Sequence, residues 1–258
     1  MFIIEEVSPE IMSELLEQAQ SQARPMISDF RVGAVAIGQS GKAYLGCNLE
    51  FPNQPLSQTV HAEQFAITLA RLHGETALQK LAVSHMPCGH CRQFLLELGQ
   101  PQLPIWVKES NQTYILDELL PHPFTLAAGR LLNPSMQELV YTQEPSLKDI
   151  AYDALEAACR SYTPYTQQGY AGVAILTEND NVYTGSTLES AAFNPTIPAF
   201  QAALIDMVTG GEPYDAIRQV LLAEAEGAPN TASSTFWALA KALSPLTQVE
   251  FATLRSSQ

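Results

Sequence analysis

The sequence predicts an α/β fold that is built twice along the chain. Short apolar runs alternate with segments whose apolar residues recur at helical spacing, the order typical of strands and helices in α/β domains. Two pairs of glycines indicate the duplication: Gly33 and Gly46 are separated by 13 positions, and so are Gly172 and Gly185. The alternative is a chance match between two unrelated α/β halves, and the shared glycine spacing argues against it.

The chain begins with a predicted helix and two strands. A helix is expected over residues 8–23, because Ser8 is a good N-cap, Pro9 suits the first turn and apolar side chains recur along one face. The apolar run 32–37 is short enough for a buried strand. After a turn, 43–47 is expected to be the returning strand.

Two further helices carry the polar residues of greatest interest. Residues 61–72 have a helical apolar pattern, and 81–83 predict another short strand. A helix is then expected from Pro87 through Leu98, with Pro87 in its first turn, where the missing N–H costs nothing. The candidate site residues therefore lie where the chain enters helices.

The later half repeats this plan. Glu50 follows Gly46 by four positions, as Glu189 follows Gly185, and the stretch from Pro87 to Phe94 parallels Pro229 to Phe236. We therefore expect an N-terminal helical segment at 1–25, a catalytic domain at 26–125, a connector at 126–150 and a degenerate domain at 151–258. The second copy is degenerate because it reads Pro198-Ala199-Phe200-Gln201 where the first has His61 and Glu63, and it has Asn230 and Ser233 opposite Cys88 and Cys91.

Charge and composition limit the function classes. The net charge of −14, from 13 basic and 27 acidic residues, disfavours a nucleic-acid partner, since phosphate contacts require Lys and Arg. No apolar run is long enough for a membrane span, and the N-terminus lacks the pattern of a signal peptide. The four cysteines therefore indicate reduced thiols or metal ligands, and a cytoplasmic protein with a small neutral substrate is expected.

Three residues form a candidate zinc site. A catalytic zinc needs three protein ligands and an open position for water, and His61, Cys88 and Cys91 can supply the ligands. The cysteines are three apart, so at a helix start their sulfurs share one face. Arg92 is a candidate for donating a hydrogen bond to a thiolate and tuning the ion, with an ordinary surface cation as the alternative.

Glu63 is the candidate proton carrier. His61 and Glu63 are two apart, about 200° around a helix, so they converge only if His61 lies at the helix mouth, outside the regular turns. Glu63 near the activated water but off the metal can take and deliver its proton. The competing interpretation is a closed structural zinc site with a fourth ligand from His85, His90 or Cys47.

These motifs resemble a known family. The strings Thr59-Val60-His61-Ala62-Glu63-Gln64 and Pro87-Cys88-Gly89-His90-Cys91-Arg92-Gln93 are similar to those of cytidine deaminases, specifically the dimeric bacterial type with two similar domains per chain. The zinc deaminases share the general pattern H-x-E…P-C-x-x-C. The resemblance implies duplicated three-layer α/β/α domains with mixed sheets, preceded here by a short N-terminal helix.

The resemblance also implies an activity and a set of contacts. The activity is hydrolytic deamination of cytidine and deoxycytidine to the uridines in pyrimidine salvage. It implies one Zn²⁺ per chain, hydroxide on zinc adding to C4 of the ring, and Glu63 moving the protons. It assigns the ribose 3′-hydroxyl to Asn48 and Glu50, the pyrimidine pocket wall to Phe30 and the base edge to the backbone of Ala62. Phe124 is implied to cover the base, and Phe193 to reach the site from the partner subunit of a homodimer.

Two departures and two competing functions stand beside this prediction. The segment before Phe30 is shorter than in the longer dimeric relatives, and His85 stands where the family has a tyrosine. A zinc deaminase acting on a nucleotide or on a base in nucleic acid would need cations that the sequence does not offer. The remaining alternative is a zinc-stabilised interaction module without catalysis.

Overall fold

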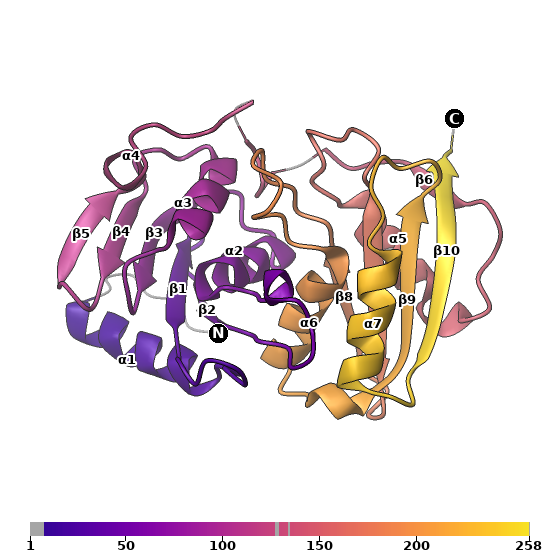
Figure 1. Cartoon of the computed structure of the whole chain (residues 1–258). Coiled ribbons are helices and arrows are strands. Elements are labelled where there is room, and N and C mark those ends of the chain that lie inside the picture. Colours follow the sequence, from indigo (N-terminus) through magenta and orange to yellow (C-terminus); the bar gives the residue numbers. More distant parts are fainter. Residues whose placement is uncertain (1–7, 127–128, 134, 258) are drawn as a thin grey trace. The chain divides into compact units, whose positions relative to one another are not determined.

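The chain folds into two compact α/β units (Figure 1). The computed structural model describes residues 8–126, 129–133 and 135–257. Unit 1 comprises Met1–Phe51, Pro55–Asn133 and Ser190–Pro195, and unit 2 comprises Pro52–Gln54, Pro134–Glu189 and Thr196–Gln258. The predicted α/β class and its duplication are confirmed. The boundaries proposed from the sequence at residues 25, 125 and 150 stay a prediction.

Unit 1 is built on a five-stranded mixed sheet in the order β2-β1-β3-β4-β5. Only the β3–β4 pair is parallel among its strand pairs, and the others are antiparallel. The elements in chain order are α1 (Pro9–Ser21), β1 (Gly33–Gly38), β2 (Ala43–Cys47), η1 (Leu56–Gln58), α2 (Ala62–Leu72), β3 (Leu78–Val83), α3 (Gly89–Leu95), η2 (Leu96–Leu98), β4 (Pro104–Val107), β5 (Gln112–Ile115) and α4 (Leu116–Leu119).

Unit 2 is built on a second mixed sheet, in the order β6-β10-β9-β7-β8, with β9 and β10 parallel. Its first strand falls inside the predicted connector, where it pairs with the end of β10. The elements in chain order are β6 (Leu139–Tyr141), η3 (Lys148–Ile150), α5 (Ala151–Cys159), β7 (Ala171–Thr177), β8 (Val182–Ser186), α6 (Ala199–Thr209), η4 (Tyr214–Ala216), β9 (Ile217–Ala225), α7 (Ser233–Leu243) and β10 (Gln248–Ser256).

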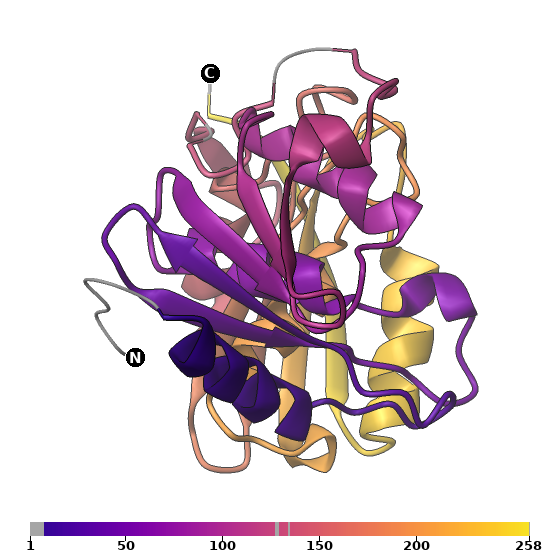
Figure 2. The ribbon, with the colours of Figure 1, turned by 90° about the vertical axis from the view of Figure 1, so that its left-hand side faces the viewer.

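Helices cover both faces of the sheet in unit 1. On one face, Leu16 of α1 packs in a core with Val35, Ile37 and Trp106, and Figure 2 views the unit from this side. The neighbouring residues of β1 point to the other face, which α2 covers, since successive strand side chains alternate. The helix expected over 8–23 is therefore α1, which packs on β1 and covers one face of the sheet. In unit 2, α5 packs on β7 in the corresponding way.

The repeated glycines mark where helices approach the sheets most closely. A Cβ on Gly46 would lie 2.3 Å from Ala62 O of α2, and a Cβ on Gly185 would lie 2.1 Å from Ala203 N of α6. The first glycine of each pair allows an equally close approach on the opposite face of the sheet. There α1 lies over Gly33 and α5 lies over Gly172. The spacing of 13 therefore follows from the hairpin, which needs one glycine under the helix on each face of the sheet. Because both units have this hairpin, the spacing occurs twice.

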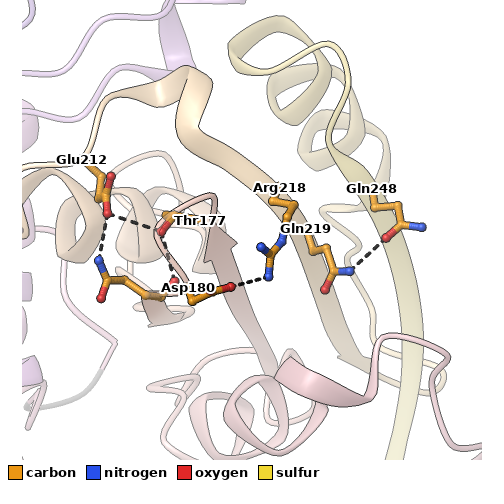
Figure 3. Close-up of polar contacts among 7 residues, drawn as sticks. Thr177, Asp180, Glu212, Arg218, Gln219 and Gln248 are labelled. Carbon is orange, nitrogen blue, oxygen red and sulfur yellow. Dashed lines mark hydrogen bonds and ion pairs between the residues drawn. The ribbon is translucent and has the colours of Figure 1, made fainter.

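A buried glutamate closes the same turn in each unit. In unit 1, Glu75 accepts hydrogen bonds from Ser40 N at 3.2 Å and Tyr44 Oη at 2.8 Å. In unit 2, Glu212 accepts from Thr177 Oγ1 at 3.3 Å (Figure 3). It also accepts from Asn181 Nδ2 at 2.9 Å. These bonds lower the pKa of Glu75 against the opposing effect of its burial, and they lower that of Glu212. Both carboxylates thus brace the hairpin that carries the paired glycines.

Two differences from the sequence expectations concern helix ends and short strands. Pro87 is not in the first turn of α3, because the helix begins at Gly89 with Cys88 as its N-cap. The four-residue strands β4 and β5 carry too little periodicity to be recognised from sequence. No helix in the described part of the chain is long and apolar enough to cross a membrane.

Substituting Gly185→Ala is expected to lower the free energy of unfolding by about 1–3 kcal/mol, the usual range for overpacking a core. The added methyl would meet the backbone of α6, which cannot move aside as a flexible side chain can. Urea denaturation measures the change. Gly89→Ala is the matched control, because a Cβ there meets nothing within 4 Å. Equal stability of the two variants would contradict the close-approach account.

Candidate zinc and nucleoside site

Two helix starts converge to form the candidate site. His61 is the N-cap of α2, with extended backbone angles φ −84° and ψ 154°, so it lies outside the regular turns. Cys88 is likewise the extended N-cap of α3. This arrangement lets the side chains of His61 and Glu63 turn to one side, which a continuous helix would prevent.

The three candidate ligands lie close enough to share one ion. His61 Nδ1 is 3.5 Å from Cys88 Sγ, and one ligand atom from each of His61, Cys88 and Cys91 lies within 4.8 Å of the others. A tetrahedral zinc separates its N and S ligands by roughly 3.5–4 Å. The donor set and its spacing therefore fit a zinc ion.

No fourth protein ligand completes this set within the described residues. His85, His90 and Cys47, the candidates for closing a structural site, are not part of the group. Burial raises the pKa of Cys47 to about 12, so it is an inert thiol. His90 stacks on His61, with ring centroids 4.9 Å apart, and supports it from the side. Three ligands with an open position are typical of catalytic zinc.

The two cysteines differ electrostatically. A hydrogen bond from Cys91, with a further one from His61, lowers the pKa of Cys88 to about 3 despite its partial burial. The hydrogen bond to Cys88 and complete burial raise the pKa of Cys91 well above its usual value. The opposite shifts favour a thiolate at Cys88 and a thiol at Cys91. A metal ion bound between the two sulfurs would displace the thiol proton.

Beside the ligands lies a pocket of about 300 Å³, at the lower end of the range for small-molecule sites. Glu63 lines this pocket and is only 5% exposed, and its burial raises its pKa. A carboxyl held in this way is suited to carrying a proton. The lining residues are Ser28, Phe30, Val32, Asn48, Glu50, Thr59, His61, Ala62, Glu63, His85, Met86 and Cys88.

Asn48 and Glu50 are both buried in the pocket wall, at 7% and 8% exposure, unlike a solvated turn. Asn48 accepts from Val32 N and donates to Phe30 O, both at 2.9 Å. Glu50 accepts from Ile27 N and Ser28 N at 2.8 Å. Burial opposes ionisation of Glu50, yet a hydrogen bond from the Ser28 hydroxyl and these backbone bonds outweigh it and lower its pKa.

His85 also lines the pocket, and two contacts fix the orientation of its ring. Its ring lies 4.8 Å from that of Phe30, and its Nδ1 is 3.0 Å from Ser84 Oγ. Ser84 Oγ also accepts from Gly33 N at 3.0 Å, so it ties His85 to the first residue of β1.

Three predicted site residues are placed elsewhere. Arg92 donates to Pro87 O at 2.7 Å and to Leu119 O at 2.9 Å, so it braces the cysteine loop without bonding a sulfur. Phe124 and Phe193 are 55% and 59% exposed and are not among the pocket-lining residues. The structure of one chain therefore does not bring these two aromatics to the site.

One supporting residue escaped sequence analysis, although its position carries a signal. Gln64 lies three residues after the N-cap His61, where a glutamine completes a capping box, and its Oε1 accepts from His61 N at 3.2 Å. Its Nε2 donates to Pro195 O at 2.8 Å and lies 3.3 Å from His90 Nε2. Gln64 thus fixes the backbone of one zinc ligand and the ring stacked on it.

Comparison with known proteins identifies the family. Residues 6–106 and, separately, residues 114–235 match the cytidine and deoxycytidylate deaminase zinc-binding region. The cytidine deaminase of Pasteurella multocida is 41% identical over 217 residues, which cover 82% of this chain and 72% of that protein. This chain belongs to the cytidine deaminase family.

Other members of the family extend the comparison. Cytidine deaminase 1 of Arabidopsis thaliana is 37% identical over 92% of this chain and 88% of its own length. The crystal structure of cytidine deaminase from Mycobacterium tuberculosis is 32% identical over 47% of this chain and 100% of that chain, with a TM-score of 0.43. Zinc is the cofactor of this deaminase, and the group of His61, Cys88 and Cys91 fits it.

Substituting Cys88→Ala is expected to release zinc, because only two ligands would remain in the group. Metal analysis of the purified variant should show at least about tenfold less zinc than the wild type, which should hold one ion per chain. Cys159→Ala is the matched control, since Cys159 is a free thiol outside the group. A Cys88→Ala variant with full zinc content would remove Cys88 from the ligand set.

Proposed function

We propose that the protein hydrolyses cytidine and deoxycytidine to uridine and deoxyuridine, with release of ammonia. The observation that carries the proposal is one pocket of about 300 Å³ that joins a three-ligand zinc group to the buried carboxyl of Glu63. Membership of the cytidine deaminase family supports the same reaction.

The chemistry divides between the cofactor and the chain. Zinc held by His61, Cys88 and Cys91 supplies the acidity that turns water into a nucleophile at neutral pH. Glu63 accepts the proton of the attacking water and delivers it first to N3 of the pyrimidine and then to the amine leaving C4. Its burial suits this work, because a carboxyl with a raised pKa gives a proton up and takes it back readily.

The pocket walls supply recognition. Asn48 and Glu50 lie on the same side of an extended segment and are proposed to bind the ribose 3′-hydroxyl. Ala62 is the first residue of α2, where backbone N–H groups have no partner within the helix and can read the base edge. Phe30 is proposed to contact the pyrimidine and ribose as an apolar wall.

The absence of cations from the pocket lining favours a nucleoside over a nucleotide. Neither Lys nor Arg is among the lining residues, whereas Glu50 and Glu63 are. A 5′-phosphate would add negative charge near these carboxylates without a partner, which is costly in a partly buried site. The nucleotide and nucleic-acid alternatives are therefore disfavoured.

We further propose a cytoplasmic homodimer in which the degenerate unit is scaffold and interface. Four free cysteines fit a reducing compartment. Phe30 lines the pocket yet is 53% exposed, so the site of one chain is open on this side. The family resemblance assigns the closing aromatic to the partner's Phe193.

The dimer can be tested by complementation. Glu63→Gln and Phe193→Ala are each expected to be inactive alone, whereas chains unfolded and refolded together should recover roughly a quarter of wild-type activity, since random mixing gives half heterodimers with one intact site each. Light scattering should give about twice the mass of the 28.1 kDa chain. No recovery, with both variants folded and dimeric, would place Phe193 outside the partner's site.

Substrate comparison tests the activity itself. Ammonia release from cytidine and deoxycytidine is expected, and kcat/KM for deoxycytidylate should be at least about 100-fold lower than for deoxycytidine, because the phosphate meets carboxylates in the pocket. The control variant Glu63→Gln should keep its zinc and lose at least about 100-fold in kcat. Undiminished turnover by Glu63→Gln would reject the proton-carrying role.

Duplication provides a matched control for the sugar contact. Glu189 accepts from Tyr165 N and Thr166 N as Glu50 accepts from Ile27 N and Ser28 N, but it lies outside the pocket lining. Glu50→Gln is expected to raise KM for cytidine at least about tenfold, whereas Glu189→Gln should leave KM unchanged. Equal KM values for the two variants would reduce Glu50 to a purely structural role.

A further inference from the structure

Unit 2 contains a cavity of about 190 Å³ that corresponds to the zinc pocket of unit 1 at several lining positions. In unit 1, Leu49 bridges Arg24 and Val60, and in unit 2, Leu188 bridges Tyr162 and Ile197 in the same senses. These bridges align three lining residues of each cavity: Asn48 with Thr187, Thr59 with Thr196, and His61 with Pro198.

The strand registers extend the correspondence to the opposite wall. Ala34 pairs with Val83 in unit 1, and Val173 pairs with Leu222 in unit 2. His85 lies two residues after Val83, and Glu224 lies two residues after Leu222. Each lines the cavity of its own unit. The cavity of unit 2 is therefore the counterpart of the first pocket and not an unrelated surface depression.

The chemistry of this cavity supports binding without catalysis. Pro198 stands where unit 1 has His61, and the lining holds neither His nor Cys, so no metal group forms here within the described residues. Thr187 is only 7% exposed and lines the cavity, yet its hydroxyl has no hydrogen-bond partner among the described residues. The hydroxyl is not among the fully buried polar atoms, so it is open to the cavity and can donate to or accept from a polar group of a ligand.

The other walls define the charge and size of that ligand. Glu224 is already engaged, accepting from Ala232 N and Thr231 Oγ1 at 2.8 Å, and the lining contains no Lys, Arg or His. An anion is therefore excluded, while Ala171 and Pro198 offer apolar surface for a flat ring. With about two thirds of the volume of the first pocket, the cavity has room for a heterocycle smaller than a nucleotide.

We propose that the cavity of unit 2 is a second, non-catalytic site for a neutral pyrimidine, with its ring inside and Thr187 hydrogen-bonded to it. The choice of ligand rests on the function proposed for the first pocket, because the correspondence carries the ligand class from one unit to the other. The shared chemistry is the pyrimidine ring, as a free base or as a nucleoside.

The test uses the full zinc-loaded chain and ¹⁹F NMR with 5-fluorouridine and, separately, 5-fluorouracil as probes. Two bound environments are expected for at least one probe. Thr187→Val should weaken one of them by about threefold to tenfold, the effect of one hydrogen bond. Asn230 is an exposed residue of the cavity lining, so Asn230→Trp should block the cavity and abolish the same bound environment. Thr184→Val, three residues earlier on β8 and outside the lining, is the matched control.

Cytidine turnover is measured in parallel on each variant and should stay within about twofold of wild type, which shows that the chains are folded. A single bound environment for both probes, or a second one that neither Thr187→Val nor Asn230→Trp affects, would overturn the site. Binding of 5-fluorouracil in the second environment indicates a base-sized site, and binding of 5-fluorouridine alone indicates a nucleoside. Loss of cytidine turnover in the wild type would instead reject the function of the first pocket.

Discussion

The contact between α2 and β2 at Gly46 controls the position of the site. Without a side chain on Gly46, the first turn of α2 lies directly on the strand, and the N-cap His61 is held at the strand's end. Because His61 is extended and not helical, its imidazole and the Glu63 carboxylate can lie on one side. The ligand group, the proton carrier and the pocket floor all depend on this one close packing of helix on sheet.

The same packing occurs at Gly185, yet the chemistry there is lost. A duplicated fold keeps what its core requires, namely the glycines under the helices and the carboxylates Glu75 and Glu212 that brace the hairpins. Metal ligands contribute nothing to that core, so the replacement of His61 by Pro198 leaves the unit able to fold. Unit 2 thus separates the residues that make the fold from those that make the enzyme.

Function in unit 1 arises from a division of labour between charged and neutral groups. The two cysteine sulfurs and the imidazole lie together at the pocket, with Glu63 buried beside them, while Asn48 and Glu50 hold the backbone of residues 27–32 in place. A site rich in acceptors and lacking cations favours a neutral polar substrate. Arg92 contributes from outside, because it binds the carbonyls that shape the cysteine loop.

The sequence by itself determined the α/β class, the duplication and the ligand types, since these follow from periodicity, glycine spacing and the donor chemistry of His61, Cys88 and Cys91. It also required His61 to lie outside the helix, because no regular turn joins it to Glu63. Only the tertiary structure decided that the group holds three ligands among the described residues, that Arg92 binds carbonyls, and that a second cavity lies at Thr187. These depend on distances between segments far apart in the chain, which local residue patterns do not specify.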